Sequence, residues 1–281
     1  MRYEAVAESN MGTVKGTNQD SVLIKHTTYR NKEVLMAIIC DGMGGLSKGE
    51  IASAIVVREF EKWFDVKLFD ELKNVDMAVI GGKWSLLLKT LNIQIREYGQ
   101  EFGERLGTTF TGVLFVEEKF LVVHVGDTRM YYIGSCLEQM TCDHTYVARE
   151  ILKGRLTPEQ ARTDKNRNML LQCVGASKMI EPQIIQGEVK QGFYMLCSDG
   201  FRHRVTEDEI YEFLNFKLLK NRQMMIKQCQ NLIKLIKQRG EKDDISVVLI
   251  KIFPDNKYRE NNILDVFRRR IDSLLFGWRG D

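Results

Sequence analysis

Short β-type segments separated by turn residues recur through most of the chain, and their spacing limits the fold more than any other feature. Four of these segments follow one another between residues 108 and 141, with turns at 117–119, 126–127 and 134–135. So close a succession is typical of an antiparallel β-meander. Further strands are predicted at residues 2–8, 21–28, 34–40, 183–189, 193–197 and 245–253.

Two pairs of helical patterns interrupt these strands. Apolar residues recur at helical spacing over 52–63 and 84–98, and Gly81-Gly82 is expected to separate the two helices. A second pair is predicted near 207–216 and 222–238. Helix pairs that alternate with antiparallel strands predict an α+β domain in which two sheets pack face to face and helices cover the outside.

The length of 281 residues and the lack of a Ser/Pro/Gly-rich linker predict one large domain, residues 1–255, followed by a tail, residues 256–281. The formal charge of +3, from 41 basic and 38 acidic residues, gives no indication of nucleic-acid binding. Neither a signal peptide nor a membrane-spanning apolar run is expected. The six cysteines form no CxxC pair and have apolar neighbours, which favours buried thiols in a reducing cytoplasm over a zinc site.

Four aspartates lie at the ends of predicted strands. Asp41 and Asp199 follow apolar segments, whereas Asp20 and Asp243 precede apolar strands. Carboxylates fixed at converging strand ends are hard oxygen ligands that suit Mg²⁺ or Mn²⁺, and a neighbouring glycine lets an ion or phosphate approach the backbone. Asp-Gly sequences also form ordinary turns. The spacing alone therefore leaves the metal-site and the turn interpretations open.

Other chemistries fit the sequence less well. The segment 42–47 lacks the last glycine of a dinucleotide-binding fingerprint and would place Asp41 against a pyrophosphate. The chain contains no Walker loop, no cysteine followed six positions later by arginine, and no GxSxG nucleophile elbow.

Seven short motifs, taken in order, connect the chain to a known family. They are 12–20 (GTVKGTNQD), 41–45 (DGMGG), 107–109 (GTT), 126–129 (GDTR), 141–144 (TCDH), 198–200 (SDG) and 243–246 (DDIS). Together they resemble the PPM (PP2C-type) metal-dependent protein serine/threonine phosphatases in their bacterial form, from about residue 3 to 253. The resemblance implies a four-layer αββα sandwich, with two antiparallel sheets flanked by helix pairs.

The same resemblance implies a site for two divalent cations, Mn²⁺ or Mg²⁺, with a third, weaker one. The implied metal ligands are Asp20, Asp41, the Gly42 carbonyl, Asp127, Asp199 and Asp243. Asp41 would bridge both metals, and Asp41, Asp199 and Asp243 are the implied catalytic residues. In the expected mechanism a hydroxide between the two metals attacks phosphorus directly, without a covalent enzyme intermediate.

Three positions depart from the family pattern. Lys15 stands where the family has a phosphate-binding arginine, Gln19 where many members have glutamate, and Met43 where animal enzymes have a histidine acid. A lysine neutralises a phosphate but cannot form the two-point contact of an arginine, so we expect weaker phosphate binding with the chemistry retained.

The expected function is dephosphorylation of phosphoserine and phosphothreonine in proteins modified by a cytosolic kinase. The alternative is a catalytically weak or inactive sensor or binding module on the same fold.

Three features carry weaker expectations. His144 is predicted to cap or orient the segment after Thr141 rather than act as an acid, and residues 143–172 correspond to a variable flap that would shape substrate access. In the tail, Leu264, Phe267, Ile271, Leu274 and Trp278 fall on one helical face beside Arg268, Arg269 and Arg270. This pattern predicts an amphipathic helix that docks on the domain or contacts a partner or an anionic membrane.

Overall fold

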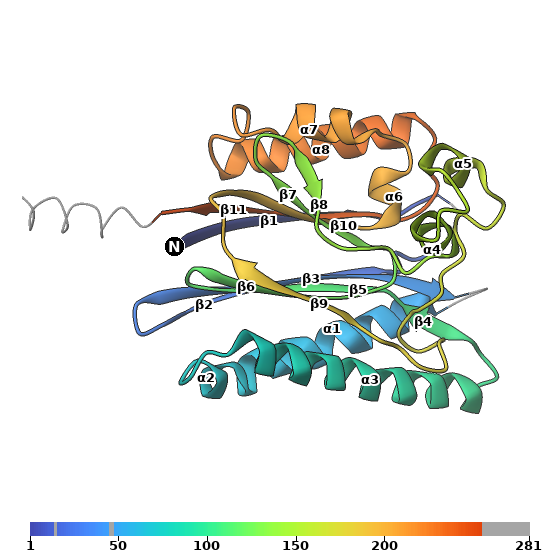
Figure 1. The fold of residues 1–281 in the computed structure, drawn as a ribbon, viewed down its shortest axis with the longest axis horizontal. Coiled ribbons are helices and arrows are strands. Elements are labelled where there is room, and N and C mark those ends of the chain that lie inside the picture. Colours follow the sequence, from blue (N-terminus) through green and yellow to red (C-terminus); the bar gives the residue numbers. More distant parts are fainter. Residues whose placement is uncertain (14–15, 45–47, 255–281) are drawn as a thin grey trace, which may run out of the picture.

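The computed structural model describes residues 1–13, 16–44 and 48–254, and there the chain forms two antiparallel sheets stacked between two layers of helices (Figure 1). One sheet has the strand order β1-β11-β10-β7-β8, and the other has the order β2-β3-β5-β6-β9 with β4 paired to β3. The expected α+β class and αββα layering are confirmed. Lys15 and the tail, residues 256–281, lie outside the described residues.

The strands are β1 (Arg2–Asn10), β2 (Asp20–Tyr29), β3 (Lys32–Gly44), β4 (Leu106–Thr108), β5 (Phe110–Val116), β6 (Lys119–Val125), β7 (Arg129–Ile133), β8 (Leu137–Gln139), β9 (Gln183–Glu188), β10 (Gly192–Cys197) and β11 (Ile245–Phe253). The helices are α1 (Gly49–Val66), α2 (Leu68–Glu71), α3 (Met77–Glu101), α4 (Tyr146–Leu152), α5 (Pro158–Thr163), α6 (Asp199–Arg202), α7 (Glu207–Leu214) and α8 (Arg222–Gln238). In the described part of the chain, none of these helices combines the length and apolarity needed to span a membrane.

The hydrophobic core has three layers, which explains why several strands are apolar on both faces. In β3, Met36 and Ile38 pack in the layer beneath α1 and α3, whereas Leu35 and Ile39 pack between the two sheets. Successive strand side chains point to opposite faces, so a strand buried on both sides reads as an uninterrupted apolar run. Helices α7 and α8 cover the outer face of the other sheet (Figure 1).

The expectation that Gly81-Gly82 separates two helices is wrong. Both glycines lie inside α3, which runs unbroken from Met77 to Glu101. A Cβ atom at Gly81 would lie 3.0 Å from the Leu121 side chain and 3.1 Å from that of Ile184. The missing side chain lets α3 pack closely on the sheet, and this tertiary contact outweighs the weak helix preference of glycine.

The predicted strand at 108–116 is divided in the structure. Strand β4 pairs with the end of β3, and β5 pairs with its middle. Thr109 lies between β4 and β5 and bonds to the backbone of β3 instead. The division places polar threonine groups at the strand end that carries Asp41.

Candidate metal centre

The four strand-end aspartates come together at one edge of the stacked sheets. Asp20 begins β2 and lies opposite Asp41 in the antiparallel register of β2 and β3. Asp199 follows β10 as the first residue of α6, and Asp243 lies just before β11. The site therefore draws on both sheets, at the end where β4 and α6 lie in Figure 1. One expectation changes, because Asp41 lies within β3 rather than after it.

Burial and mutual repulsion set the electrostatics of this edge. The pKa of the Asp41 carboxyl lies well above its usual range because the group is buried and because Asp20, Asp199, Asp127 and Asp243 are nearby. Burial, together with the charges of Asp244 and Asp199, raises the pKa of Asp20 to about 7. Six carboxylates thus act on Asp20 or Asp41 or belong to them, a density of negative charge that cations would neutralise.

Several carboxylate oxygens here are free to bind an ion. The hydroxyls of Ser246 and Ser198 lie near the Asp20 carboxylate and partly offset the rise of its pKa. Neither buried oxygen of Asp20, nor Oδ1 of Asp199, makes a hydrogen bond of ordinary geometry. Buried polar atoms are nearly always hydrogen-bonded, so such atoms indicate a ligand site. Oxygen donors of this kind fit Mg²⁺ or Mn²⁺.

The described carboxylates do not, however, converge closely enough to form a complete coordination shell. Among the described residues, no three His, Cys, Asp or Glu side chains are grouped closely enough to bind one metal ion by themselves. The set implied for one metal, Asp41 with Asp199 and Asp243, is near but not assembled. Water and backbone carbonyl oxygens would complete such a coordination shell, as is common for Mg²⁺.

The backbone of Asp41 is fixed by two threonines of the 107–109 motif. The Asp41 N–H donates to Oγ1 of Thr109 at 2.9 Å, and the Thr109 N–H donates to the Asp41 carbonyl at 2.9 Å. The Thr108 hydroxyl donates to the same carbonyl at 3.0 Å. These bonds hold the strand end in place, so the carboxylate depends little on its own side-chain contacts for position.

Gly42 is required by close backbone packing. A Cβ atom there would lie 2.3 Å from the Gly49 carbonyl oxygen and 2.6 Å from that of Gln19. The Gly42 N–H also donates to the Gln19 carbonyl at 3.1 Å. Strand β3, the start of α1 and the opening loop therefore meet at this residue, where no side chain fits.

Asp244 is a site residue that the sequence interpretation missed. Its carboxylate accepts the Gly12 N–H at Oδ1 and the Gln19 N–H at Oδ2, both at 2.8 Å. The side chain is buried and ties the loop before β2 to the start of β11. A second aspartate directly after Asp243 was the only signal in the sequence, and a local pattern cannot reveal bonds to residues more than 220 positions away.

Asp127 lies in a different setting from the other aspartates. Burial and the Asp199 charge raise the pKa of its carboxyl to about 7, although Arg202 opposes this shift. Nη2 of Arg202 donates to Asp127 Oδ2 at 3.3 Å and to its carbonyl at 3.1 Å. The protein itself thus supplies one cation to Asp127, which makes this group the weaker candidate metal ligand.

His144 orients the backbone next to Asp127. The Gly126 N–H donates to His144 Nδ1 at 3.2 Å, and the His144 N–H donates to the Gly126 carbonyl at 2.7 Å. Burial lowers the pKa of the imidazole, which favours the neutral acceptor form. This geometry agrees with the expected orienting role.

The sequence profile of the protein phosphatase 2C family matches residues 13–234. The chain belongs to the protein phosphatase 2C family. The match covers the motifs at the site from the opening loop to α6, and it ends within α8 before Asp243.

Named relatives of this family member are bacterial. The serine/threonine protein phosphatase PstP of Mycobacterium tuberculosis is 30% identical over 255 residues, which are 90% of this chain and 45% of PstP. Protein phosphatase PhpP of Streptococcus pneumoniae is 28% identical over 249 residues, 87% of this chain and 95% of PhpP. The chain therefore spans about half the length of PstP and nearly all of PhpP.

Solved structures give the same fold. Serine/threonine phosphatase Stp1 from Staphylococcus aureus has a TM-score of 0.77 at 29% identity, covering 90% of this chain and 96% of that one. The PstP catalytic domain in complex with two manganese ions has a TM-score of 0.71 at 27% identity, covering 90% of this chain and 99% of that one.

Proposed function

We propose that this family member is a metal-dependent protein phosphatase that hydrolyses phosphoserine and phosphothreonine. The observation that carries the proposal is the group of buried carboxylates at the joint edge of the two sheets, with raised pKa values at Asp20 and Asp41 and unbonded oxygens at Asp20 and Asp199. The names of its relatives, and the two manganese ions in the PstP catalytic domain, support the same chemistry.

In this proposal Asp41 would be shared by two cations, Asp20 and the Gly42 carbonyl would hold one of them, and Asp199 and Asp243 would hold the other. Mn²⁺ or Mg²⁺ bound there would lower the pKa of a water molecule that attacks phosphorus in line, and would stabilise the charge on the phosphoryl oxygens. The chain's own residues hold the carboxylates in register across the two sheets. Asp127 would serve a third, weaker cation.

The substrates in this proposal are cytoplasmic proteins phosphorylated by a serine/threonine kinase. Residues 1–255 would form the phosphatase domain, with Lys15 at the substrate phosphate. The tail, residues 256–281, would be a separate element that contacts the domain, a partner or an anionic membrane.

The test is a phosphatase assay on p-nitrophenyl phosphate and on a phosphothreonine peptide, with and without Mn²⁺. We expect turnover that requires the metal and falls about a thousandfold in Asp41→Ala and in Asp199→Ala, because the metals supply several kcal/mol of transition-state stabilisation. Asp65→Ala is the matched control, since it removes an acid with a half-exposed side chain on α1.

Turnover that survives chelation of the metal would contradict the proposed chemistry. If the correctly folded chain shows no turnover with Mn²⁺ or Mg²⁺, the alternative of an inactive binding module on this fold is supported instead.

A further inference from the structure

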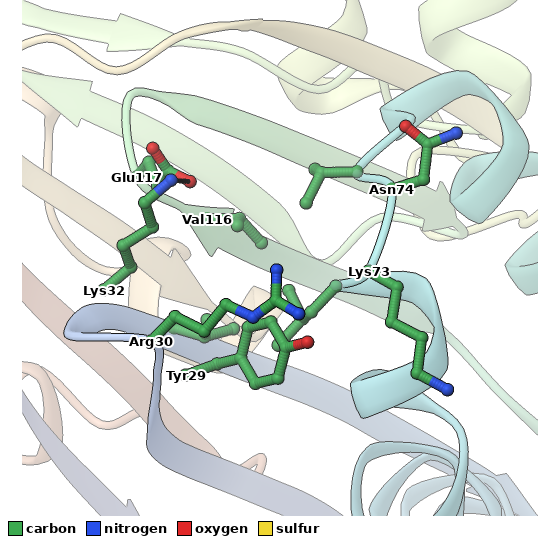
Figure 2. Close-up of a pocket in the computed structure, with 10 residues that line it drawn as sticks. Tyr29, Arg30, Lys32, Lys73, Asn74, Val116 and Glu117 are labelled. Atoms are coloured by element: carbon green, nitrogen blue, oxygen red, sulfur yellow. Dashed lines mark ion pairs between the residues drawn. The ribbon is translucent and has the colours of Figure 1, made fainter.

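Figure 2 shows a cavity of about 290 Å³ that is lined by residues at the turn of the β2–β3 hairpin. The candidate metal centre lies at the opposite end of this hairpin. Its buried lining is apolar and includes Val34, Leu72 and Val116. Its rim carries Arg30, Lys32, Lys73, Asn74 and Glu117, together with the ring of Tyr29. A concave apolar floor with a few polar groups at the rim is the usual construction of a small-molecule site.

Positive φ angles are concentrated around this cavity. In the described part of the chain, four residues other than glycine have positive φ, and three of them are here: Arg30 at 49°, Asn31 at 64° and Glu117 at 56°. Tyr29 pairs with Lys32, so Arg30 and Asn31 form a two-residue hairpin loop, which requires positive φ at both positions. Asparagine and glycine suit such positions, whereas arginine is strained there. Strained residues of this kind cluster at functional sites.

Of the three basic residues at the rim, Arg30 forms no ion pair with the described residues, whereas Lys32 and Lys73 do. Lys32 pairs with Glu117 at 2.6 Å, and Lys73 pairs with Asp70 at 2.8 Å. The Arg30 guanidinium has no ion-pair or hydrogen-bond partner among the described residues and lies 5.1 Å from the centre of the Tyr29 ring. Figure 2 shows it extended over that ring, while Lys32 turns toward Glu117. A guanidinium that lies over an aromatic ring and has no acidic partner keeps its N–H groups available, and their planar arrangement matches a carboxylate or a phosphate.

This cavity is separate from the metal centre. Asp20 and Asp41 pair at one end of the hairpin, and Tyr29 and Lys32 pair at the other end. At about 3.3 Å per residue, the two ends lie roughly 30 Å apart. A ligand in the cavity would therefore occupy a second site, and its binding does not depend on the proposed phosphatase activity.

We propose that this cavity binds a small organic anion, with a carboxylate or phosphate-like group on Arg30 and an apolar part against the partly exposed Tyr29 and Val75, above the buried Val34, Leu72 and Val116. The single unpaired cation fits a ligand with one anionic group at this position. The partly exposed side chains of Tyr29 and Val75 distinguish an organic anion from an inorganic one, because an inorganic ion would leave their apolar surface in water.

The experiment is a titration of the full ¹⁵N-labelled chain in Mg²⁺ with phenylphosphonate, followed by NMR at constant ionic strength. We expect saturable shifts of the amides at 30–32 and 73–75, apart from any shifts at the metal centre. Inorganic phosphate should bind here at least about tenfold more weakly than phenylphosphonate. Equal binding of the two would overturn the assignment to an organic anion.

Two variants test the role of Arg30. Arg30→Gln and Arg30→Asn should each weaken phenylphosphonate binding at least about tenfold, since each removes the guanidinium. Arg30→Asn should also raise the unfolding temperature, because asparagine suits the strained turn. Loss of binding in a more stable protein cannot be ascribed to misfolding.

The matched control is Arg58→Gln, which removes the same charge from an exposed position on α1 and should leave binding within about twofold. Shifts that do not saturate, or an affinity that the Arg30 variants leave unchanged, would overturn the proposal.

Discussion

Two groups of buried carboxylates lie close together in this protein and differ in the cation that accompanies them. At the strand ends, Asp20 and Asp41 face other acids, and their pKa values are raised. Asp143 is largely buried, but Nε and Nη2 of Arg129 donate to its two oxygens, each at 2.8 Å. Burial alone would raise the pKa of Asp143, yet the Arg129 bonds and charge hold it below its usual range.

The comparison shows that burial of an acid does not by itself indicate a metal site. Asp143 receives its positive charge from the chain and stabilises the fold at the base of the 143–172 segment. Asp20 and Asp41 form no ion pair with the described residues around them, so either a proton, as their raised pKa values indicate, or an added cation would neutralise them. Asp127 is intermediate, because Arg202 contacts it while Asp199 repels it.

The largest effect should come from neutralising one acid of each group. Asp143→Asn removes the partner of a largely buried arginine and should lower the free energy of unfolding by about 3 kcal/mol. Asp41→Asn removes one of several repelling charges and, in metal-free protein, should raise it by about 1 kcal/mol. Chemical denaturation of both variants in a chelator measures the two changes. If the free energy of unfolding changed in the same direction in both variants, Asp143 and Asp41 would not differ in the way proposed.

The stability of the metal-free protein should depend on pH in opposite ways through Asp20 and through Asp143. Asp20 has a folded pKa of about 7 against an ordinary value of 3.8, so the folded state binds more protons between these values. Its contribution to stability is complete below about pH 4 and is lost as the pH rises through 7. Asp143 has a lowered pKa and acts in the opposite sense, losing its contribution only as the pH falls below the usual aspartate range.

Thermal unfolding in a chelator between pH 4 and 8 tests this difference. The unfolding temperature should fall as the pH rises toward 7, and Asp20→Asn should flatten that slope. Addition of Mg²⁺ should restore more stability at pH 7.5 than at pH 5, because the carboxylates are then ionised. If the unfolding temperature of Asp20→Asn changed with pH as steeply as that of the unmodified chain, Asp20 would not be the group that causes the pH dependence.

The smallest effect concerns the phosphate rather than the carboxylates. Arg129 contacts Asp143 at two points, and Lys15 cannot contact a phosphate in that way. Lys15→Arg should therefore raise kcat/KM on a phosphothreonine peptide by about threefold to tenfold, roughly one added hydrogen bond. A decrease in activity would mean that Lys15 does not bind the substrate phosphate.

The sequence was sufficient to predict the layers and the identity of the strand-end aspartates. Apolar runs buried on both faces, such as 34–40, and helical spacing over 84–98 depend on local periodicity, which a single sequence displays. The Gly81-Gly82 expectation failed because contacts with Leu121 and Ile184, distant in the chain, outweigh the local preference of glycine. The division at Thr109 was not predicted because it too depends on a distant segment, the end of β3, with which β4 pairs.

What the sequence by itself determined is which residues can bind cations and which strands carry them, since residue chemistry and strand periodicity are local properties. Only the tertiary structure decided which acids lack a positive partner. In the tertiary structure Asp20 lies opposite Asp41, Arg129 donates hydrogen bonds to Asp143, and Asp244 accepts a hydrogen bond from the opening loop. These outcomes depend on distances between segments far apart in the chain, and electrostatic energy is a function of those distances rather than of sequence order.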